Sequence, residues 1–70
     1  GDNMQHIVTI DQVLDIKNKT RYWLSKETEI YYPSIIKLCN NQTSSISFDT
    51  ITKICIALEC TPSDIIKIIK

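Results

Sequence analysis

The sequence predicts one small all-α domain of five short helices. Its 70 residues include only one Gly and two Pro, a composition that favours helices over a turn-rich β fold. Apolar residues recur at three- and four-residue spacing between Phe48 and Leu58, which is the strongest helical periodicity in the chain. Hydroxyl residues followed by prolines or acids mark several helix starts. Because Ile is abundant and prefers strands, the spacing of apolar residues decides each assignment.

The N-terminal part is expected to be extended and then helical. Residues 5–10 (QHIVTI) alternate weakly between polar and apolar, as in an extended arm or a short strand. From Ile10 onward, Val13 and Leu14 follow helical spacing, and Asn18 is a suitable place for the helix to stop.

Two helices are expected in the middle of the chain. Thr20 can accept hydrogen bonds from the first-turn amides of a helix that ends near Glu29. Pro33 suits the first turn of the next helix, over Tyr31–Cys39, where a missing N–H costs nothing. The inward sides of these two helices are expected to carry Trp23, Leu24, Thr28, Ile35 and Leu38.

The C-terminal part is expected to form two further helices after a polar loop over residues 40–45. Ser47 can cap the strongly periodic helix that contains Phe48, Ile51, Ile54, Cys55 and Leu58. Residues 61–64 (TPSD) then combine an N-cap, a first-turn proline and an acid that can bond back to the cap. The last helix is expected to place its apolar side at Ile65, Ile66 and Ile69.

We divide the chain into an N-terminal arm, residues 1–9, and a single domain, residues 10–70. The sequence contains no internal repeat, no low-complexity segment and no linker long enough to separate two domains. The residues ahead of Met4 are interpreted, in part or in full, as a cloning remnant.

Composition excludes several classes of function. No apolar run approaches the roughly 20 residues of a membrane span, and the three Cys residues, odd in number and without a CxxC pair, indicate reduced thiols in the cytoplasm. His6 and the three Cys residues lack the short ligand spacing of a zinc site, so neither a metal nor a cofactor is expected. With one His, no Gly-rich phosphate loop and no carboxylate pair in an evident pocket, we expect neither an enzyme nor a small-molecule substrate.

The segment from Thr20 to Asp64 resembles the Cro/repressor-type (Xre-like) helix-turn-helix domains of phage and bacterial transcriptional regulators. The resemblance rests on framework residues in unbroken register and on the run ISFDTITKICIALECTPSDII, residues 46–66, which is its most specific part. The framework residues are Thr20, Leu24, Ser25, Thr28, Ile30, Ile35, Lys37, Leu38 and Asn40. The resemblance implies a compact five-helix, lambda-repressor-like fold whose recognition helix, Tyr31 to Cys39, lies in the DNA major groove.

Site residues follow from this resemblance position by position. The residues implied to contact base edges are Tyr32, Pro33, Ile36 and Lys37. The residues implied to contact the sugar-phosphate backbone are Thr20, Arg21, Asn40, Gln42 and Thr43, with amides and side-chain donors near Asn40 directed at phosphate oxygens. Tyr31 is expected to fold onto the core, and Cys39, at the end of the recognition helix, is expected to be the accessible thiol.

The distribution of charge gives one argument against DNA binding and one in favour of it. Eight basic and eight acidic residues give a formal net charge of zero, which is unusual for a DNA binder and requires a local basic face. Lys17, Lys19, Arg21 and Lys26 cluster around the start of the Thr20 helix, and the acids are expected to lie elsewhere, including Asp11 and Asp15 on the first helix.

Three departures from the family pattern affect binding or the turn. Glu29 stands where the family has Gly in a turn that commonly needs positive φ, and Asn41 replaces another Gly. Ser44 and Ser45 occupy loop positions that are often basic in the family. With fewer phosphates neutralised, we expect weak DNA binding by a lone monomer.

The interpretation is a homodimeric regulator of transcription, most simply a repressor, on a palindromic operator of double-stranded DNA. Its dimer contacts are expected from the last helix or the arm, among Ile7, Val8, Ile65, Ile66, Ile68 and Ile69. Two alternatives remain open: a protein-interaction module on the same fold (an antitoxin, anti-repressor or inhibitor), or the DNA-binding part of a longer regulator.

Overall fold

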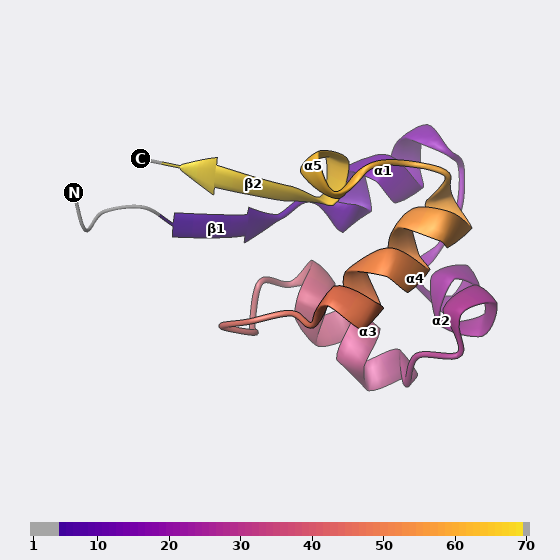
Figure 1. Ribbon diagram of the computed structural model, residues 1–70. Helices are drawn as coiled ribbons and strands as arrows, with labels where there is room; N and C mark the ends of the chain where they lie inside the picture. Colours follow the sequence, from indigo (N-terminus) through magenta and orange to yellow (C-terminus); the bar gives the residue numbers. More distant parts are fainter. Residues whose placement is uncertain (1–4, 70) are drawn as a thin grey trace.

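Five helices and a two-stranded sheet make up the described part of the chain, residues 5–69 of a computed structural model. The interpretation of the residues ahead of Met4 lies outside this range. Figure 1 shows the elements in chain order: β1 (Gln5–Val8), α1 (Ile10–Ile16), α2 (Arg21–Thr28), α3 (Tyr32–Cys39), α4 (Phe48–Leu58), α5 (Pro62–Ile65) and β2 (Ile66–Ile69). The expected five-helix fold is confirmed, and the arm is the short strand β1.

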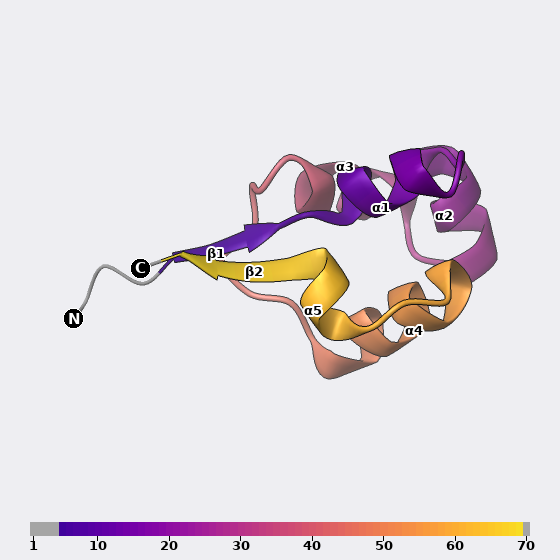
Figure 2. The same ribbon diagram turned by 90° about the horizontal axis from the view of Figure 1, so that it is seen from above.

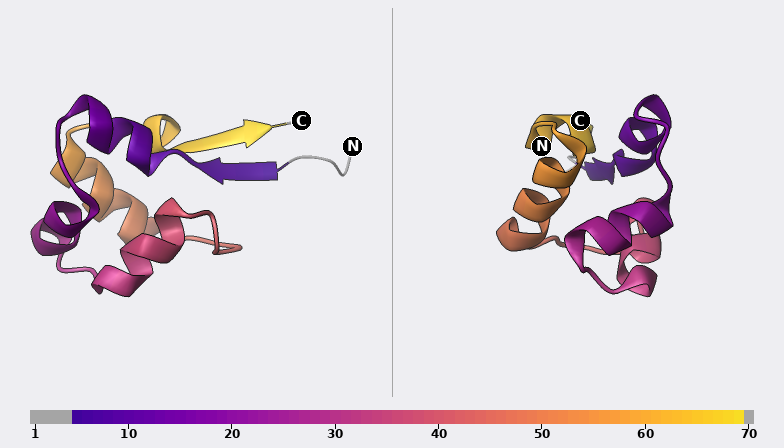
Figure 3. Two further views of the ribbon diagram at one scale, coloured as in Figure 1. Left: turned by 180° about the vertical axis from the view of Figure 1, so that it is seen from behind. Right: turned by 90° about the vertical axis from the view of Figure 1, so that its right-hand side faces the viewer.

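The helices form two layers around one apolar core. Figure 2 shows α1, α2 and α3 on one side and α4 and α5 on the other, and the right-hand view of Figure 3 agrees. The core contains Ile10, Val13, Leu14, Leu24, Ile35, Leu38, Cys39, Ile54, Cys55, Leu58 and Ile65, with Trp23 and Ile51 packed against it at the edge. Most periodic positions therefore face inward as predicted, and burial of these side chains is the main stabilising contribution. Phe48 is the exception: it lies in the first turn of α4 and is 88% exposed.

Hydroxyl caps begin two of the long helices, as expected from the sequence. The Thr20 Oγ1 accepts a hydrogen bond from the Trp23 amide at 3.0 Å, and the Ser47 Oγ accepts one from the Thr50 amide at 3.1 Å. At the start of α5, the Asp64 carboxylate accepts from the backbone N–H of Thr61, the N-cap residue, at 2.9 Å. Each contact satisfies a backbone donor that has no partner inside its helix.

Left-handed residues end the first four helices, and none of them is Gly. Asn18, Glu29, Asn41 and Glu59 have φ between 53° and 60°. After α1, α3 and α4 the backbone closes a Schellman motif. After α3, for example, the Asn41 amide donates to Leu38 O at 3.1 Å and the Gln42 amide donates to Lys37 O at 2.9 Å. In the left-handed conformation the Cβ of any L-residue crowds the following carbonyl; the short side chain of Asn can offset this cost by local hydrogen bonding, and the longer side chain of Glu does so less readily.

The turn after α2 is closed by side-chain hydroxyls. Ser25 Oγ donates to Ile30 O at 2.6 Å, and the Ile30 amide donates to Thr28 Oγ1 at 3.3 Å. Both hydroxyl residues are buried, and Glu29, with φ 60° and ψ 21°, lies between Thr28 and Ile30 in the turn that they close. Glu29 therefore adopts the conformation that the family provides with Gly, and the two buried hydroxyls hold it there.

The expected last helix is wrong beyond Ile65. Residues 66–69 form β2, which pairs antiparallel with β1 in the register Gln5↔Ile69 to Val8↔Ile66. The β-branched run Ile66, Ile68, Ile69 gains a strand partner from the N-terminal arm, and a single helical turn at α5 is enough to bury Ile65. Figures 1 and 2 show the resulting ribbon projecting beyond the helices at the end of the molecule where both chain ends lie.

Asn41 joins the ribbon to the C-terminal end of α3. Its Oδ1 accepts from the Val8 amide at 2.6 Å, and its Nδ2 donates to Val8 O at 3.2 Å. Val8 also pairs with Ile66 of β2. The Asn41 side chain therefore makes the two hydrogen bonds with Val8 that a third strand of the sheet would make. The left-handed backbone that ends α3 directs this side chain toward β1.

Candidate nucleic-acid interface

The segments α2 and α3, joined by a turn at residues 29–31, form the helix-turn-helix. Ile35, Leu38 and Cys39 point into the core, so the opposite side of α3 faces outward. At the centre of that outward side are Pro33 and Lys37, both exposed.

Three of the four expected base-contacting side chains of α3 are exposed. Tyr32, Pro33 and Lys37 lie at the surface, and Ile36 is half-buried on the α2 side of the same face. We call the outward surface formed by these four residues the α3 face. Ser34 is also exposed, but on the α4 side of the helix, next to Thr43 and Thr50.

Tyr31 is not packed against the core, contrary to expectation. Its side chain is 74% exposed, whereas that of Tyr32 is 40% exposed. The Tyr32 ring makes an edge-to-face contact with Tyr22, with ring centroids 5.6 Å apart and planes at 77°. Lys26 places its Nζ 5.2 Å from the centre of the Tyr22 ring. Tyr22 thus supports Tyr32 from α2 and is a surface aromatic that the sequence interpretation did not select.

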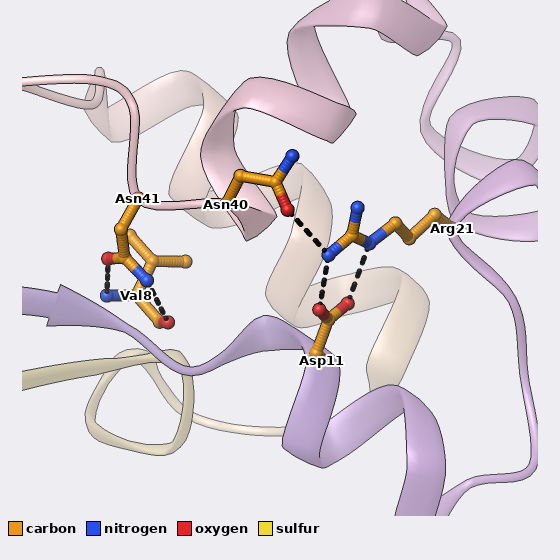
Figure 4. Close-up of polar contacts among 5 residues, drawn as sticks. All are labelled: Val8, Asp11, Arg21, Asn40 and Asn41. Carbon is orange, nitrogen blue, oxygen red and sulfur yellow. Dashed lines mark hydrogen bonds and ion pairs between the residues drawn. The ribbon is translucent and has the colours of Figure 1, made fainter.

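Arg21 forms a network with Asp11 and Asn40 that links α1, α2 and α3 (Figure 4). Its Nε donates to Asp11 Oδ1 at 2.9 Å, and its Nη2 donates to both Asp11 Oδ2 and Asn40 Oδ1, the latter at 3.0 Å. These hydrogen bonds hold the pKa of the Asp11 carboxyl below its usual range. The acids are therefore not all remote from the basic cluster, since Asp11 neutralises its most constrained member.

This network orients the Asn40 side chain and leaves its amide nitrogen available to donate a hydrogen bond. Its oxygen accepts from Arg21, so the amide nitrogen remains free to donate, and Figure 4 shows it directed away from Arg21. The backbone amides of Asn40, Asn41 and Gln42 already donate to carbonyls of α3, so these three amides are not available to phosphates. The side chains of Asn40, Gln42 and Thr43 are exposed.

Two exposed lysines, Lys19 before α2 and Lys26 within it, lie over aromatic rings. Lys19 Nζ lies 4.9 Å from the centre of the Trp23 ring, and Lys26 is over Tyr22. Such contacts fix the position of an ammonium group without neutralising it. Lys19, Lys26 and Lys37 are therefore exposed cations in or beside α2 and α3, on a chain with zero net charge.

The thiols differ from the expectation. Cys39 is buried, and burial raises its pKa to about 12, whereas Cys60 is the partly exposed thiol, its pKa raised by burial to about 11. Cys39 is hidden because it occupies the core side of α3, one turn beyond Ile35. Within residues 5–69, no group of three or more His, Cys, Asp or Glu side chains lies close enough to hold a metal ion.

The six expected dimer residues do not share one environment. Ile65 is fully buried in the core and cannot contact a second copy, which corrects that assignment. Val8 and Ile66 pack against the core at its edge, while Ile68 and Ile69 are 55% and 46% exposed. Ile7 is intermediate.

Comparison with protein families decides what this arrangement is. The model of the Cro/C1-type HTH DNA-binding domain matches residues 9–70, almost the whole chain. The chain belongs to this family. As a Cro/C1-type domain it has the fold and the exposed helix-turn-helix of a DNA-binding module of transcription regulation.

Solved structures agree with this assignment. A protein from Bacteroides fragilis, provisionally described as DNA-binding, superposes with a TM-score of 0.79 at 25% identity, over 90% of this chain and 100% of that one. The transcriptional regulator VanUg superposes with a TM-score of 0.80 over 99% of this chain and 91% of that one; at 18% identity this likeness shows the fold alone. A search of curated proteins gives no significant match. In the described range, no helix has the length and apolar character needed to cross a membrane.

Proposed function

We propose that this Cro/C1-type domain binds double-stranded DNA in a sequence-dependent manner, with α3 in the major groove, and represses transcription. The observation that carries the proposal is the α3 face. Tyr32, Pro33 and Lys37 are at the surface, and the opposite side of the same helix is buried in the core. A helix exposed in this way at the second position of a helix-turn-helix is suited to reach base edges.

The residues around α3 support backbone contacts. The free Asn40 amide nitrogen, the Thr20 hydroxyl and the exposed Gln42 and Thr43 side chains can each donate to a phosphate oxygen. In this proposal Arg21 acts through Asn40, which it orients, as well as through its own charge.

A homodimer completes the proposal. The exposed Ile68 and Ile69 and the outer edge of β2 lie at one end of a molecule 38 Å long, and Figure 1 places α3 near the middle of that length. Two copies joined through their ribbons would separate their α3 helices by a distance comparable to 38 Å. Successive major-groove sites on one side of DNA are about 34–36 Å apart, so a palindrome with half-sites one helical turn apart fits this arrangement.

The primary test is a titration of random duplex DNA at low and moderate salt, followed by site selection from a random pool. We expect Lys37→Ala to relax sequence preference by about 1–3 kcal/mol at one position. Asn40→Ala should weaken all sequences alike and leave the salt slope unchanged, because a neutral amide releases no counterion. Lys53→Ala removes the same charge from α4, in the layer opposite α2 and α3 in Figure 2, and serves as the matched control. Absence of salt-dependent binding at high micromolar protein would eliminate the DNA proposal, and sedimentation as a monomer at that concentration would eliminate the dimer.

A protein-interaction role on the same fold is the second candidate, favoured by the 74% exposed Tyr31 and the 57% exposed Tyr22. Aromatic residues are enriched at protein interfaces, and zero net charge does not oppose such a partner. The same DNA titration separates the two candidates, because this role requires no salt-dependent binding to duplex DNA.

A further inference from the structure

The α3 face is unusually apolar for a surface that meets base edges. Of its four residues, Pro33 and Ile36 carry no polar side-chain atom, Tyr32 carries one hydroxyl, and Lys37 is the only cation of α3. Polar recognition of bases relies on Arg or Lys for guanine and on Asn or Gln for adenine. The face therefore has the means for one guanine contact and little capacity for others.

Asn40 does not supply the missing adenine contact. An Asn that recognises adenine uses its oxygen and nitrogen together, accepting from N6 and donating to N7. The Asn40 oxygen already accepts from Arg21 at 3.0 Å, and Arg21 is in turn held by Asp11. Because Arg21 fixes the direction of the Asn40 oxygen, the amide cannot turn freely to align both of its groups with an adenine edge, whereas its nitrogen alone can donate to a phosphate.

The apolar groups of the face are held in place. The Tyr32 ring is supported edge-to-face by Tyr22, whose other contact is Lys26. Pro33 has a fixed φ and no rotatable side chain, and Ile36 is half-buried and β-branched. A rigid apolar surface loses little conformational entropy when it packs against another apolar group.

We propose that the α3 face recognises the C5-methyl groups of thymine in the major groove, with Lys37 adding one guanine or thymine-oxygen contact. This inference rests on the proposed DNA binding and specifies the kind of base that is read. Thymine is the base that presents an apolar group in the major groove of unmodified DNA, and apolar side chains contact it there. The preferred half-site is consequently rich in thymine opposite Tyr32, Pro33 and Ile36.

The test replaces thymine by deoxyuridine, one position at a time, in duplexes selected from a random pool. This substitution removes a methyl group and leaves every hydrogen-bonding group unchanged. At a contacted position we expect affinity to fall about fourfold, the effect of exposing one methyl-sized group. Ile36→Ala should reduce the thymine-to-uracil affinity ratio toward one at its own position and leave the ratios elsewhere unchanged.

The controls distinguish failure of this inference from failure of DNA binding. Because each ratio compares two duplexes with the same protein preparation, a partly unfolded variant gives the same ratio as a folded one. Lys37→Ala should weaken binding to thymine and uracil duplexes equally. Equal affinity of the wild-type protein for both duplexes overturns methyl recognition while leaving DNA binding intact. Lack of binding to any selected or random duplex removes the proposed function itself.

Discussion

Replacing Glu29 with Gly should stabilise the domain, although Gly normally weakens a helix or its neighbourhood. Glu29 holds φ at 60° directly after Thr28, in the turn closed by the buried hydroxyls of Ser25 and Thr28. A left-handed conformation costs an L-residue about 1–2 kcal/mol, while the extra freedom of Gly in the unfolded chain costs about 0.5–1 kcal/mol. The difference predicts a gain of about 0.5–1 kcal/mol in the free energy of unfolding.

Urea denaturation measures this gain directly. With an m-value near 1 kcal/mol/M for a chain of this size, the midpoint should rise by about 0.5–1 M, and Tm should rise by several degrees. The matched control is Glu27→Gly, two residues earlier on the exposed side of α2. It removes the same charge from a right-handed position and should lower the free energy of unfolding by about 0.5–1 kcal/mol.

The two variants together test the reasoning about backbone strain. If both midpoints move in the same direction, charge removal or a general effect of Gly explains the data, and the left-handed conformation of Glu29 has no measurable cost. If Glu29→Gly is destabilising, the buried hydroxyls rather than the backbone preference determine the geometry of the turn.

Three further outcomes are expected. Asn41→Gly should keep the left-handed backbone but lose both hydrogen bonds to Val8. Hydrogen exchange of the Val8 amide, measured by NMR, should therefore become faster, and an unchanged exchange rate would contradict the link between α3 and β1. Because Arg21 lowers the folded-state pKa of Asp11, that contribution to stability is present above about pH 4, the unfolded value, and is lost as pH falls through the folded pKa. Asp11→Asn should therefore flatten the acid side of a stability–pH curve, and an unaltered curve would refute the pair's contribution. Alkylation of the native protein at pH 7.5, followed by mass spectrometry, should be slow, because the pKa values of Cys39 and Cys60 are both raised. Cys60 should be modified before Cys39, because it is the more exposed thiol. The reverse order would contradict the burial of Cys39 on the core side of α3.

Local signals predicted the helices because their causes are local. The caps at Thr20 and Ser47 and the proline at the start of α5 lie within a few residues of the amides they affect. The apolar spacing from Ile51 to Leu58 likewise identifies the inner side of α4 without knowledge of its neighbours, although the same spacing wrongly included the exposed Phe48. Sequence reasoning therefore succeeded for helix positions and for most of the core.

The errors concern partners that are distant in sequence. Residues 66–69 contain enough apolar groups for a helix, and only pairing with β1, at the other end of the chain, makes them a strand. The partner of Arg21 is Asp11, ten residues away on another helix, so spacing alone suggested a free cation. Tyr31 was assigned to the core from its residue type, but its position at the N-cap of α3 directs it to solvent.

The pairing of β1 with β2 has a kinetic consequence. Joining Val8 to Ile66 closes a loop of about 60 residues, and the entropy lost in that closure must be compensated before the strands gain from it. The helices bring the two chain ends together through local contacts, so we expect the ribbon to form after the folding transition state. Substitutions in the ribbon should then accelerate unfolding and leave the folding rate nearly unchanged, which stopped-flow chevron plots can measure. Since Asn41 connects the ribbon to α3, the C-terminal end of α3 would be among the last parts of the domain to become fixed.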